Sequence, residues 1–346
     1  MSIISRKSAK FMSIAAVAAL ALTGCASNAA PSVDYLACAV SDEGSWNDKS
    51  FNESVYDGLT KAKTELGVQT ADAESNSAED FAPNLQQMVD AGCDITFAVG
   101  FNLVAAVNEA AKGNPDMKFV TIDGWSEGNA NLKPVTYAME QSSYLAGYAA
   151  AAYSTTKVVG TYGGMQIDAV TAFMDGFYYG AKAYEAETGT PVKVLGWDPV
   201  AKTGDFMGDF TPNSGVSKTI AATQIQAGAD VILPVAGDQF GAVSEALDEA
   251  GSNGVMIGVD KNIAVTSPEY ADKMLTSVEK RMTTAVFDII KGIAIDKADF
   301  SGDAYVGTLA NGGTALSDSD KISSELKAKL DELSAGIQDG SIKVRP

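Results

Sequence analysis

Three aspartates stand where strands of an open α/β sheet would end, which is where such sheets bind their ligands. Asp42, Asp123 and Asp260 each follow a short apolar run. Their carboxylates could accept hydrogen bonds from amino or imino groups, or from a pair of adjacent hydroxyls. The ammonium of Lys280 could donate to the same hydroxyls while balancing Asp260. The simpler alternatives are an Asp-Gly turn at Asp123 and an exposed ion pair between Asp260 and Lys280.

A further group of candidates precedes the expected helix 50–66. Asn47 and Asp48 carry short polar side chains, which either contact a ligand or cap the helix. Ser50 and Glu53 have the spacing of a capping box, in which the serine side chain satisfies a free N–H group of the first turn. If Ser50 caps the helix, the carboxylate of Asp48 is free for another role.

The residues on which most catalytic and metal sites depend are missing from this sequence. The chain has no histidine, so the commonest general base and the commonest metal ligand are absent. The sequence contains no nucleophile elbow of the Gly-x-Ser-x-Gly type and no Walker phosphate loop. We therefore expect no enzyme activity, no cofactor and no metal ion.

Residues 1–24 have the pattern of an export signal. Three basic residues precede the apolar run 11–22, which is too short for a permanent membrane-spanning helix. The Thr-Gly-Cys that follows resembles a bacterial lipobox, which implies cleavage before Cys25 and attachment of a lipid to its sulfur. The alternative is an ordinary signal with an incidental cysteine. Residues 25–32 would then be a flexible tether, with acyl chains anchoring the protein to the extracytoplasmic face of the cell membrane.

The net charge argues against nucleic-acid partners. It is −19 for the whole chain, and because residues 1–24 contain three basic and no acidic side chains, the exported chain would carry −22. Such a surface repels phosphate backbones. A DNA-binding regulator would also need an N-terminal DNA-binding module, and this chain has the export signal in that place.

Besides Cys25, the sequence contains two cysteines, Cys38 and Cys93. An exported protein can form a disulfide bond between two such residues. Cysteines are also common as separate, small buried residues in cores of this kind. The second arrangement is the one that we expect here.

Short apolar runs alternate with helical patterns, which is typical of a parallel sheet covered by helices on both faces. The alternation occurs twice and predicts two α/β lobes, with the cleft between them as the default ligand site. We assign residues 33–139 and 263–300 to lobe 1 and residues 140–262 and 301–346 to lobe 2, which requires several crossings and hence a hinge. The expected strands are 33–40, 68–73, 94–99, 118–122, 158–162, 192–195, 231–235, 255–259, 274–278 and 304–309, and the expected helices are 50–66, 81–89, 103–111, 144–153, 169–185, 217–227, 240–250, 283–295 and 323–333.

Residues 44–52 read Gly-Ser-Trp-Asn-Asp-Lys-Ser-Phe-Asn and resemble the opening motif of the basic membrane protein family. Members of that family are solute-binding lipoproteins of ABC transporters, and the purine nucleoside receptors form one branch of it. Trp46 stands where the family usually has phenylalanine. The other segments that resemble family motifs are 208–210, 228–232, 234–237, 258–260 and 277–281.

The resemblance implies the two-lobed fold of type I periplasmic binding proteins, with three strands joining the lobes, and a base held between two phenylalanines. By motif position these are Phe51 and Phe210, although Phe51 also shares a helix face with apolar residues and could belong to the core. The resemblance also places Asn47 and Asp48 near the ligand. It implies that Gly237 lets the backbone approach the sugar closely.

The implied function is capture of a nucleoside, a purine nucleoside in particular, by a monomer that delivers it to an ABC permease in the membrane. A sugar or another polar solute could use the same aromatic and acidic side chains, and a ligand sensor could have the same site. The chain departs from the family pattern at residues 238–240 and at residues 261–262, which affects the sugar end of the site.

Overall fold

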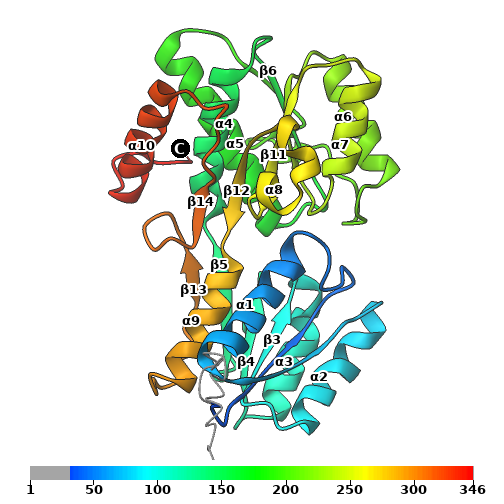
Figure 1. Ribbon diagram of the computed structural model, residues 1–346, viewed down its shortest axis with the longest axis vertical. Helices are drawn as coiled ribbons and strands as arrows, with labels where there is room; N and C mark the ends of the chain where they lie inside the picture. The colour runs from blue at the N-terminus through cyan, green and yellow to red at the C-terminus, as the bar shows by residue number, and fades with distance from the viewer. Residues whose placement is uncertain (1–31, 346) are drawn as a thin grey trace, which may run out of the picture.

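The computed structural model describes residues 32–345, so the export signal, Cys25 and most of the predicted tether lie outside the described part of the chain. Figure 1 shows two lobes joined by a narrow set of neighbouring segments. Each lobe contains a six-stranded sheet flanked by helices. The predicted α/β class and two-lobed arrangement are therefore confirmed. Among the helices of residues 32–345, none combines the length and the apolar character that crossing a membrane requires.

The sheet of the first lobe is parallel throughout, in the order β13-β5-β4-β3-β1-β2. Helices cover both faces of such sheets, and central strands such as β3 are accordingly buried along their whole length. Its strands are β1 (Leu36–Val40), β2 (Gln69–Ala73), β3 (Ile95–Val99), β4 (Lys118–Ile122), β5 (Leu132–Tyr137) and β13 (Tyr305–Gly307), and its helices are α1 (Phe51–Leu66), η1 (Ala78–Asp80), α2 (Phe81–Asp90), η2 (Phe101–Leu103), α3 (Val104–Gly113) and α9 (Met282–Ala294).

The sheet of the second lobe has the order β14-β12-β11-β10-β6-β7 and is parallel except at β14. A separate hairpin, β8 with β9, lies beside it. Its elements are α4 (Met139–Tyr153), β6 (Val158–Gly163), α5 (Asp168–Thr188), β7 (Lys193–Leu195), β8 (Trp197–Asp198), β9 (Thr203–Gly204), α6 (Gly215–Gln226), β10 (Val231–Val235), α7 (Phe240–Glu249), β11 (Val255–Asp260), α8 (Ile263–Thr266), η3 (Pro268–Lys273), β12 (Met274–Lys280), β14 (Thr314–Leu316) and α10 (Ser324–Gln338).

The chain passes between the lobes three times: after β5, after β12, and between β13 and β14. The three connections run side by side at one edge of the molecule (Figure 1). After the second crossing, α9 packs on α1 and so belongs to the first lobe. Several short connections of this kind form a hinge about which the lobes can open and close.

The predicted lobe boundaries differ from the observed sheets in two places. Residues 274–280 form β12 of the second sheet, although the pattern assigns 263–300 to lobe 1. Residues 305–307 form β13 of the first sheet, although the pattern assigns 301–346 to lobe 2. An apolar run indicates that a strand exists, but the sheet that it joins depends on which sheet offers an unpaired edge, and the run does not encode that.

Cys38 and Cys93 form a disulfide bond, with their Cα atoms 6.0 Å apart. The expectation that they are separate buried thiols is therefore wrong. Cys38 lies on β1, and Cys93 precedes β3, the strand beside β1 in the sheet. The reason for the pairing is thus the strand order, which places two segments that are 55 residues apart next to each other.

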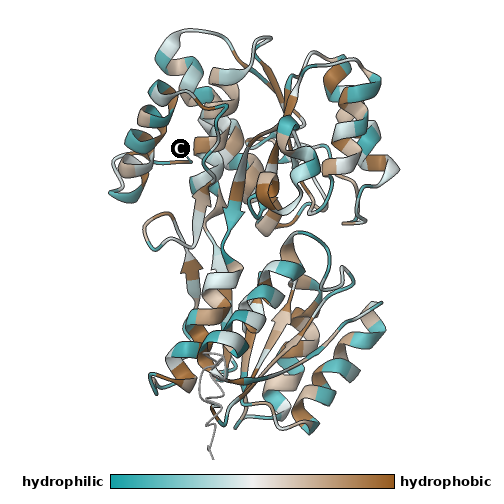
Figure 2. Cartoon of the chain, viewed as in Figure 1, coloured by the Kyte–Doolittle hydropathy of each residue, from teal (hydrophilic) through white to brown (hydrophobic). Residues whose placement is uncertain are grey.

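Hydrophobic residues concentrate in the two sheets and on the helix faces that cover them (Figure 2). In the second lobe, α4 and α5 pack backbone against backbone. A Cβ atom at Gly147 would lie 2.0 Å from the carbonyl oxygen of Phe177, and one at Gly180 would lie 1.9 Å from that of Tyr144. These contacts explain the small residues of α4, since a larger side chain at either glycine would force the helices apart.

Candidate functional site

A cavity of about 470 Å³ lies between the two lobes and is lined by residues of both. Its walls come from the segments that follow β1, β3 and β4 in the first lobe, and from the ends of β10, β11 and β12 in the second. These are carboxyl ends of parallel strands, where open α/β sheets bind ligands. The volume is in the range of small-molecule sites.

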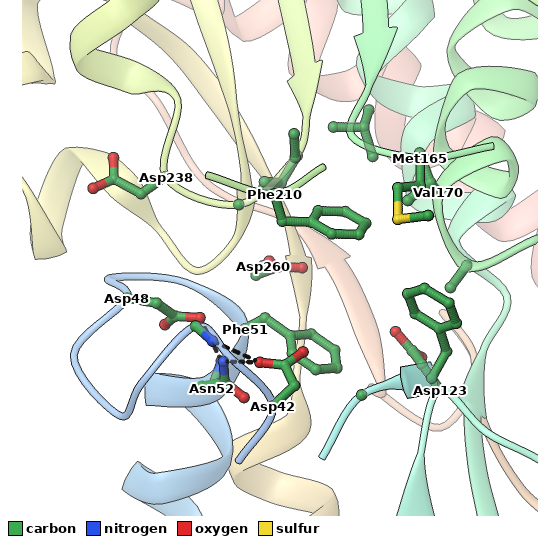
Figure 3. A pocket seen from close by; sticks show the side chains of 18 of the residues that line it. Asp42, Asp48, Phe51, Asn52, Asp123, Met165, Val170, Phe210, Asp238 and Asp260 are labelled. Carbon is green, nitrogen blue, oxygen red and sulfur yellow. Dashed lines mark hydrogen bonds between the residues drawn. The ribbon is translucent and has the colours of Figure 1, made fainter. Parts of the chain in front are cut away.

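Phe51 and Phe210 reach the cavity from opposite lobes (Figure 3). Phe51 begins α1 and is half-buried, so its packing against the core leaves part of the ring facing the cavity. Phe210 lies in the loop before α6, and 37% of the residue is exposed. Figure 3 shows Asp260 behind the space between the two rings. The structure thus brings the two predicted rings to one pocket.

The cavity is also lined by two further phenylalanines, which the sequence motifs do not reveal. Phe101 follows β3, and its ring meets that of Phe210 edge-on, with centroids 6.5 Å apart. Because Phe101 stands just beyond a strand end, the rule that indicated the three aspartates could have found it. Phe173 lies on α5, where an apolar residue gives no indication that it borders a pocket.

Lys280 forms the central ion pair of the cavity. Its Nζ lies 2.5 Å from Oδ2 of Asp123, and the two side chains are only 4% and 10% exposed. The simpler alternative, an exposed ion pair between Lys280 and Asp260, is therefore wrong, because Lys280 is buried and its partner is Asp123. Since β12 leads straight into a crossing, its last residue faces the end of β4 in the other lobe. The ammonium also lies 5.2 Å from the ring centroid of Phe51 and 5.5 Å from that of Phe173, within the range of cation–π contacts.

Asp260 is buried at the end of β11, and its Oδ2 accepts a 2.5 Å hydrogen bond from the hydroxyl of Ser50 in the opposite lobe. Burial raises the pKa of Asp260, while the charge of Lys280 and the hydroxyl of Ser50 oppose the shift. The predicted cap at Ser50 is wrong, because its side chain makes no capping bond to α1. It bridges the lobes instead.

Asp48 caps α1 in place of Ser50. Its carboxylate accepts hydrogen bonds from the backbone N–H groups of Ser50 at 2.9 Å, Asn52 at 2.8 Å and Glu53 at 3.0 Å. A negative charge is favourable at this end of a helix. Burial nevertheless raises the pKa of Asp48 to about 6, because it outweighs the hydrogen bonds. Asp48 also lines the cavity, so capping and ligand contact are not alternatives for this residue.

Asp42 lines the cavity beside Asp48 and is held from two sides (Figure 3). Its Oδ1 accepts hydrogen bonds from the N–H of Gly44 at 3.0 Å and from Nδ2 of Asn52 at 2.7 Å. Burial raises its pKa. The amide oxygen of Asn52, also in the cavity wall, is buried without a hydrogen-bond partner among the described residues. Because a buried acceptor without a donor is costly, Asn52 offers a ligand donor a place to bind.

Asn47 and the adjacent Trp46 lie outside the cavity wall. Asn47 is exposed and accepts a 2.6 Å hydrogen bond from Nζ of Lys49. The resemblance places Asn47 near the ligand, but in the structure its side chain lies outside the cavity wall. Trp46 is buried, stacks on Tyr56 and donates its indole N–H to Asp72. The tryptophan that replaces the usual phenylalanine therefore anchors the motif segment.

Gly237 follows β10 and lines the cavity with a φ of 69°, a left-handed conformation that favours glycine. A Cβ atom there would lie 3.9 Å from Ser50, so the backbone conformation rather than lack of space calls for glycine. The next residue, Asp238, belongs to the cavity wall, and burial raises its pKa. Figure 3 shows its carboxylate pointing away from the two rings, so the departure from the family pattern places an acidic residue at the margin of the site.

The cavity is strongly acidic. Seven of the described residues that line it are Asp or Glu, and Lys280 is the one cation among them and is already paired. The field inside the cleft therefore favours neutral or cationic ligands over anions. No group of three residues suited to hold a metal ion was found within residues 32–345.

The sequence profile of the Bmp family, described as "ABC transporter substrate-binding protein PnrA-like", matches residues 36–345. A protein of Lactococcus lactis subsp. cremoris named "ABC transporter nucleoside-binding protein BmpA" is 32% identical over 96% of both chains. "Basic membrane protein A" of Borreliella burgdorferi is 29% identical over 85% of this chain and 83% of its own. An uncharacterised lipoprotein of Pyrococcus abyssi is 31% identical over 78% of this chain and 66% of its own.

Solved structures share the fold. An ABC transporter solute-binding protein of Aeropyrum pernix K1 superposes with a TM-score of 0.78 at 24% identity, over 89% of this chain and 92% of that one. A periplasmic solute-binding protein of Actinobacillus succinogenes, solved with bound D-allose, gives a TM-score of 0.61 at 14% identity over 82% and 98%. At these identities the likeness concerns the architecture alone.

Proposed function

Since this chain belongs to the Bmp family of PnrA-like ABC transporter substrate-binding proteins, which bind solutes and are not enzymes, we propose that it captures nucleosides, purine nucleosides in particular, for its permease. The observation that carries the proposal is the pair of rings, Phe51 and Phe210, that face one cavity from opposite lobes. A flat base fits between two such rings. Stacking on an aromatic side chain contributes about 1–3 kcal/mol per base.

The polar groups of the cavity suit the rest of a nucleoside. Asp260 and Asp123 could accept hydrogen bonds from ribose hydroxyls or from a base N–H, and Lys280 could donate to a hydroxyl oxygen. The unpartnered amide oxygen of Asn52 adds an acceptor for a base amino or imino group. The positive φ of Gly237 brings a stretch of backbone to the same wall.

The acidity of the cavity separates nucleosides from nucleotides. A nucleoside is neutral, whereas a 5′-phosphate would add about two negative charges to a space lined by seven carboxylates and one paired lysine. Repulsion in a cleft with low-dielectric walls is stronger than in water. We therefore infer that the ligand is the unphosphorylated form.

A second part of the proposal concerns where the protein is located. We propose that Cys25 carries a lipid and that residues 25–32 tether a monomer to the outer face of the cell membrane, where it meets its permease. Lipoprotein names among the relatives support this proposal. Metabolic labelling with a radioactive fatty acid should mark the protein, and the Cys25→Ala variant should remain unlabelled.

Isothermal titration calorimetry of the purified protein tests the ligand. Inosine, guanosine and adenosine should bind, and the matching 5′-monophosphates, free bases and D-ribose serve as controls. We expect at least a hundredfold preference for a nucleoside over its monophosphate. The absence of binding by all purine and pyrimidine nucleosides would contradict the proposal, and binding of a free sugar in their place would favour a sugar receptor.

A further inference from the structure

Outside the cavity, one side chain joins the two lobes through charge. Nζ of Lys261, just after β11 in the second lobe, lies 2.7 Å from Oε1 of Glu53 and 2.8 Å from Oδ2 of Asp57. Both carboxylates stand on α1 of the first lobe. None of the three residues lines the cavity.

This triad is partly shielded from water, which gives its charges more weight than an ordinary surface pair has. The side chains of Lys261 and Glu53 are 13% and 19% exposed, and that of Asp57 is 47% exposed. Burial alone would lower the pKa of Lys261, but the two carboxylates reverse the effect and raise it. Within residues 32–345, the other ion pair between the lobes joins Lys280 to Asp123 inside the cavity.

The backbone conformation at Asp260 points the side chains of Asp260 and Lys261 in different directions. Asp260 has a φ of 67°, and the N–H of Lys261 donates to the carbonyl oxygen of Val259 across it, which forms a γ-turn. This conformation is rare and strained for a residue other than glycine. With this conformation, the side chain of Asp260 points into the cavity and accepts a hydrogen bond from Ser50. The side chain of Lys261 points outside the cavity and donates to Glu53, about one helical turn after Ser50.

We propose that Lys261, Glu53 and Asp57 form a clasp that favours the closed arrangement of the lobes and thereby raises ligand affinity from outside the pocket. These contacts can form only when the loop after β11 lies against α1, so they stabilise the closed state alone. The apparent dissociation constant falls as the fraction of closed, binding-competent molecules rises. Lys261 is thus a positioning residue that does not touch the ligand.

The chain supplies a matched control. Lys218 also pairs with two carboxylates, those of Glu245 and Glu249, but all three residues belong to the second lobe. Lys218→Met removes the same charge from a more exposed triad, whose lysine is 31% and whose two glutamates are each 68% exposed, without touching the contact between lobes. Lys261→Met keeps an unbranched side chain of similar length and removes the charged group.

Small-angle X-ray scattering of the ligand-free protein measures closure directly. We expect Lys261→Met and the double variant Glu53→Gln/Asp57→Asn to have a larger radius of gyration than the wild type, with Lys218→Met unchanged. With inosine as the probe, both clasp variants should bind about three- to tenfold more weakly. Raising NaCl from about 50 to 500 mM should weaken binding by the wild type more than by Lys261→Met, since salt screens the clasp.

An unchanged radius of gyration in both clasp variants would overturn the clasp, as would an equal change in Lys218→Met. A merely structural role would lower the melting temperature without opening the lobes. The scattering measurement needs no ligand. Failure of inosine to bind the wild type would therefore contradict the proposed function, while the clasp would still be judged by the shape of the free protein.

Discussion

Replacing Phe210 with alanine removes one of the two rings that the proposed function requires. In the structure 37% of Phe210 is exposed, and a phenylalanine side chain offers roughly 200 Å² of surface, so about 70 Å² is free for a ligand to cover. At about 25 cal/mol per Å², this area corresponds to about 2 kcal/mol, within the range of base stacking. We expect the dissociation constant for inosine to rise by about 20- to 30-fold.

The assay is isothermal titration calorimetry with three variants. Phe210→Leu keeps apolar surface but lacks a π face, and it should fall between the wild type and Phe210→Ala. Tyr153→Ala is the control, because Tyr153 is 36% exposed in the same lobe but lies outside the cavity wall. An affinity of Phe210→Ala equal to that of the wild type would refute stacking, and wild-type affinity in Phe210→Leu would show that apolar surface suffices and that the π face is not what matters.

Three further predictions concern the ion pair, the disulfide and a buried acid. Lys280→Met leaves Asp123 buried without its cation. In denaturant titrations this variant should have an unfolding free energy lower by about 3–5 kcal/mol, and adding Asp123→Asn to the same chain should restore part of the lost stability. Cys38→Ala/Cys93→Ala opens a loop of 55 residues; it should lower the unfolding free energy by about 4 kcal/mol with inosine affinity unchanged, and an unaltered denaturation midpoint would count against the bond. Because burial raises the pKa of Asp48 to about 6, the folded chain holds a proton that the unfolded chain releases above about pH 4, so this group stabilises the fold as the pH falls from 7 to 4. The wild type should therefore gain stability relative to Asp48→Asn as the pH falls from 7 to 4, and parallel curves would contradict the shift.

The sequence predicted the elements and one wall of the site for a physical reason. Parallel strands are buried on both faces, so they read as short apolar runs, and whatever follows each run lies at the same edge of the sheet. Asp42, Asp123 and Asp260 were found in this way, and all three line the cavity. Phe101 satisfies the same rule, which shows that the rule extends beyond acidic residues.

The pairings within the site could not be predicted, because they depend on which lobe each strand end faces. Lys280 ends a strand of the second sheet yet binds Asp123 of the first. Ser50 has the spacing of a helix cap, but Asp48, two residues earlier, can reach the same N–H groups. Once Asp48 takes that role, the hydroxyl of Ser50 is free to cross to Asp260. Local spacing permits either Ser50 or Asp48 to cap α1. The contact of Ser50 with Asp260 in the opposite lobe determines which of the two occurs.

The first turns of α1 connect ligand contact with closure. Phe51 faces the cavity, while Ser50 just before it donates to Asp260 of the other lobe, and Glu53 just after it accepts from Lys261. Asp260 and Lys261 are themselves neighbours, so two adjacent residues of the second lobe hold two points of one helix. If a ligand stacks on Phe51, as proposed, and draws the loop after β11 toward α1, it would strengthen both contacts at once. The proposed recognition and the proposed closure would then be coupled through the same short stretch of chain.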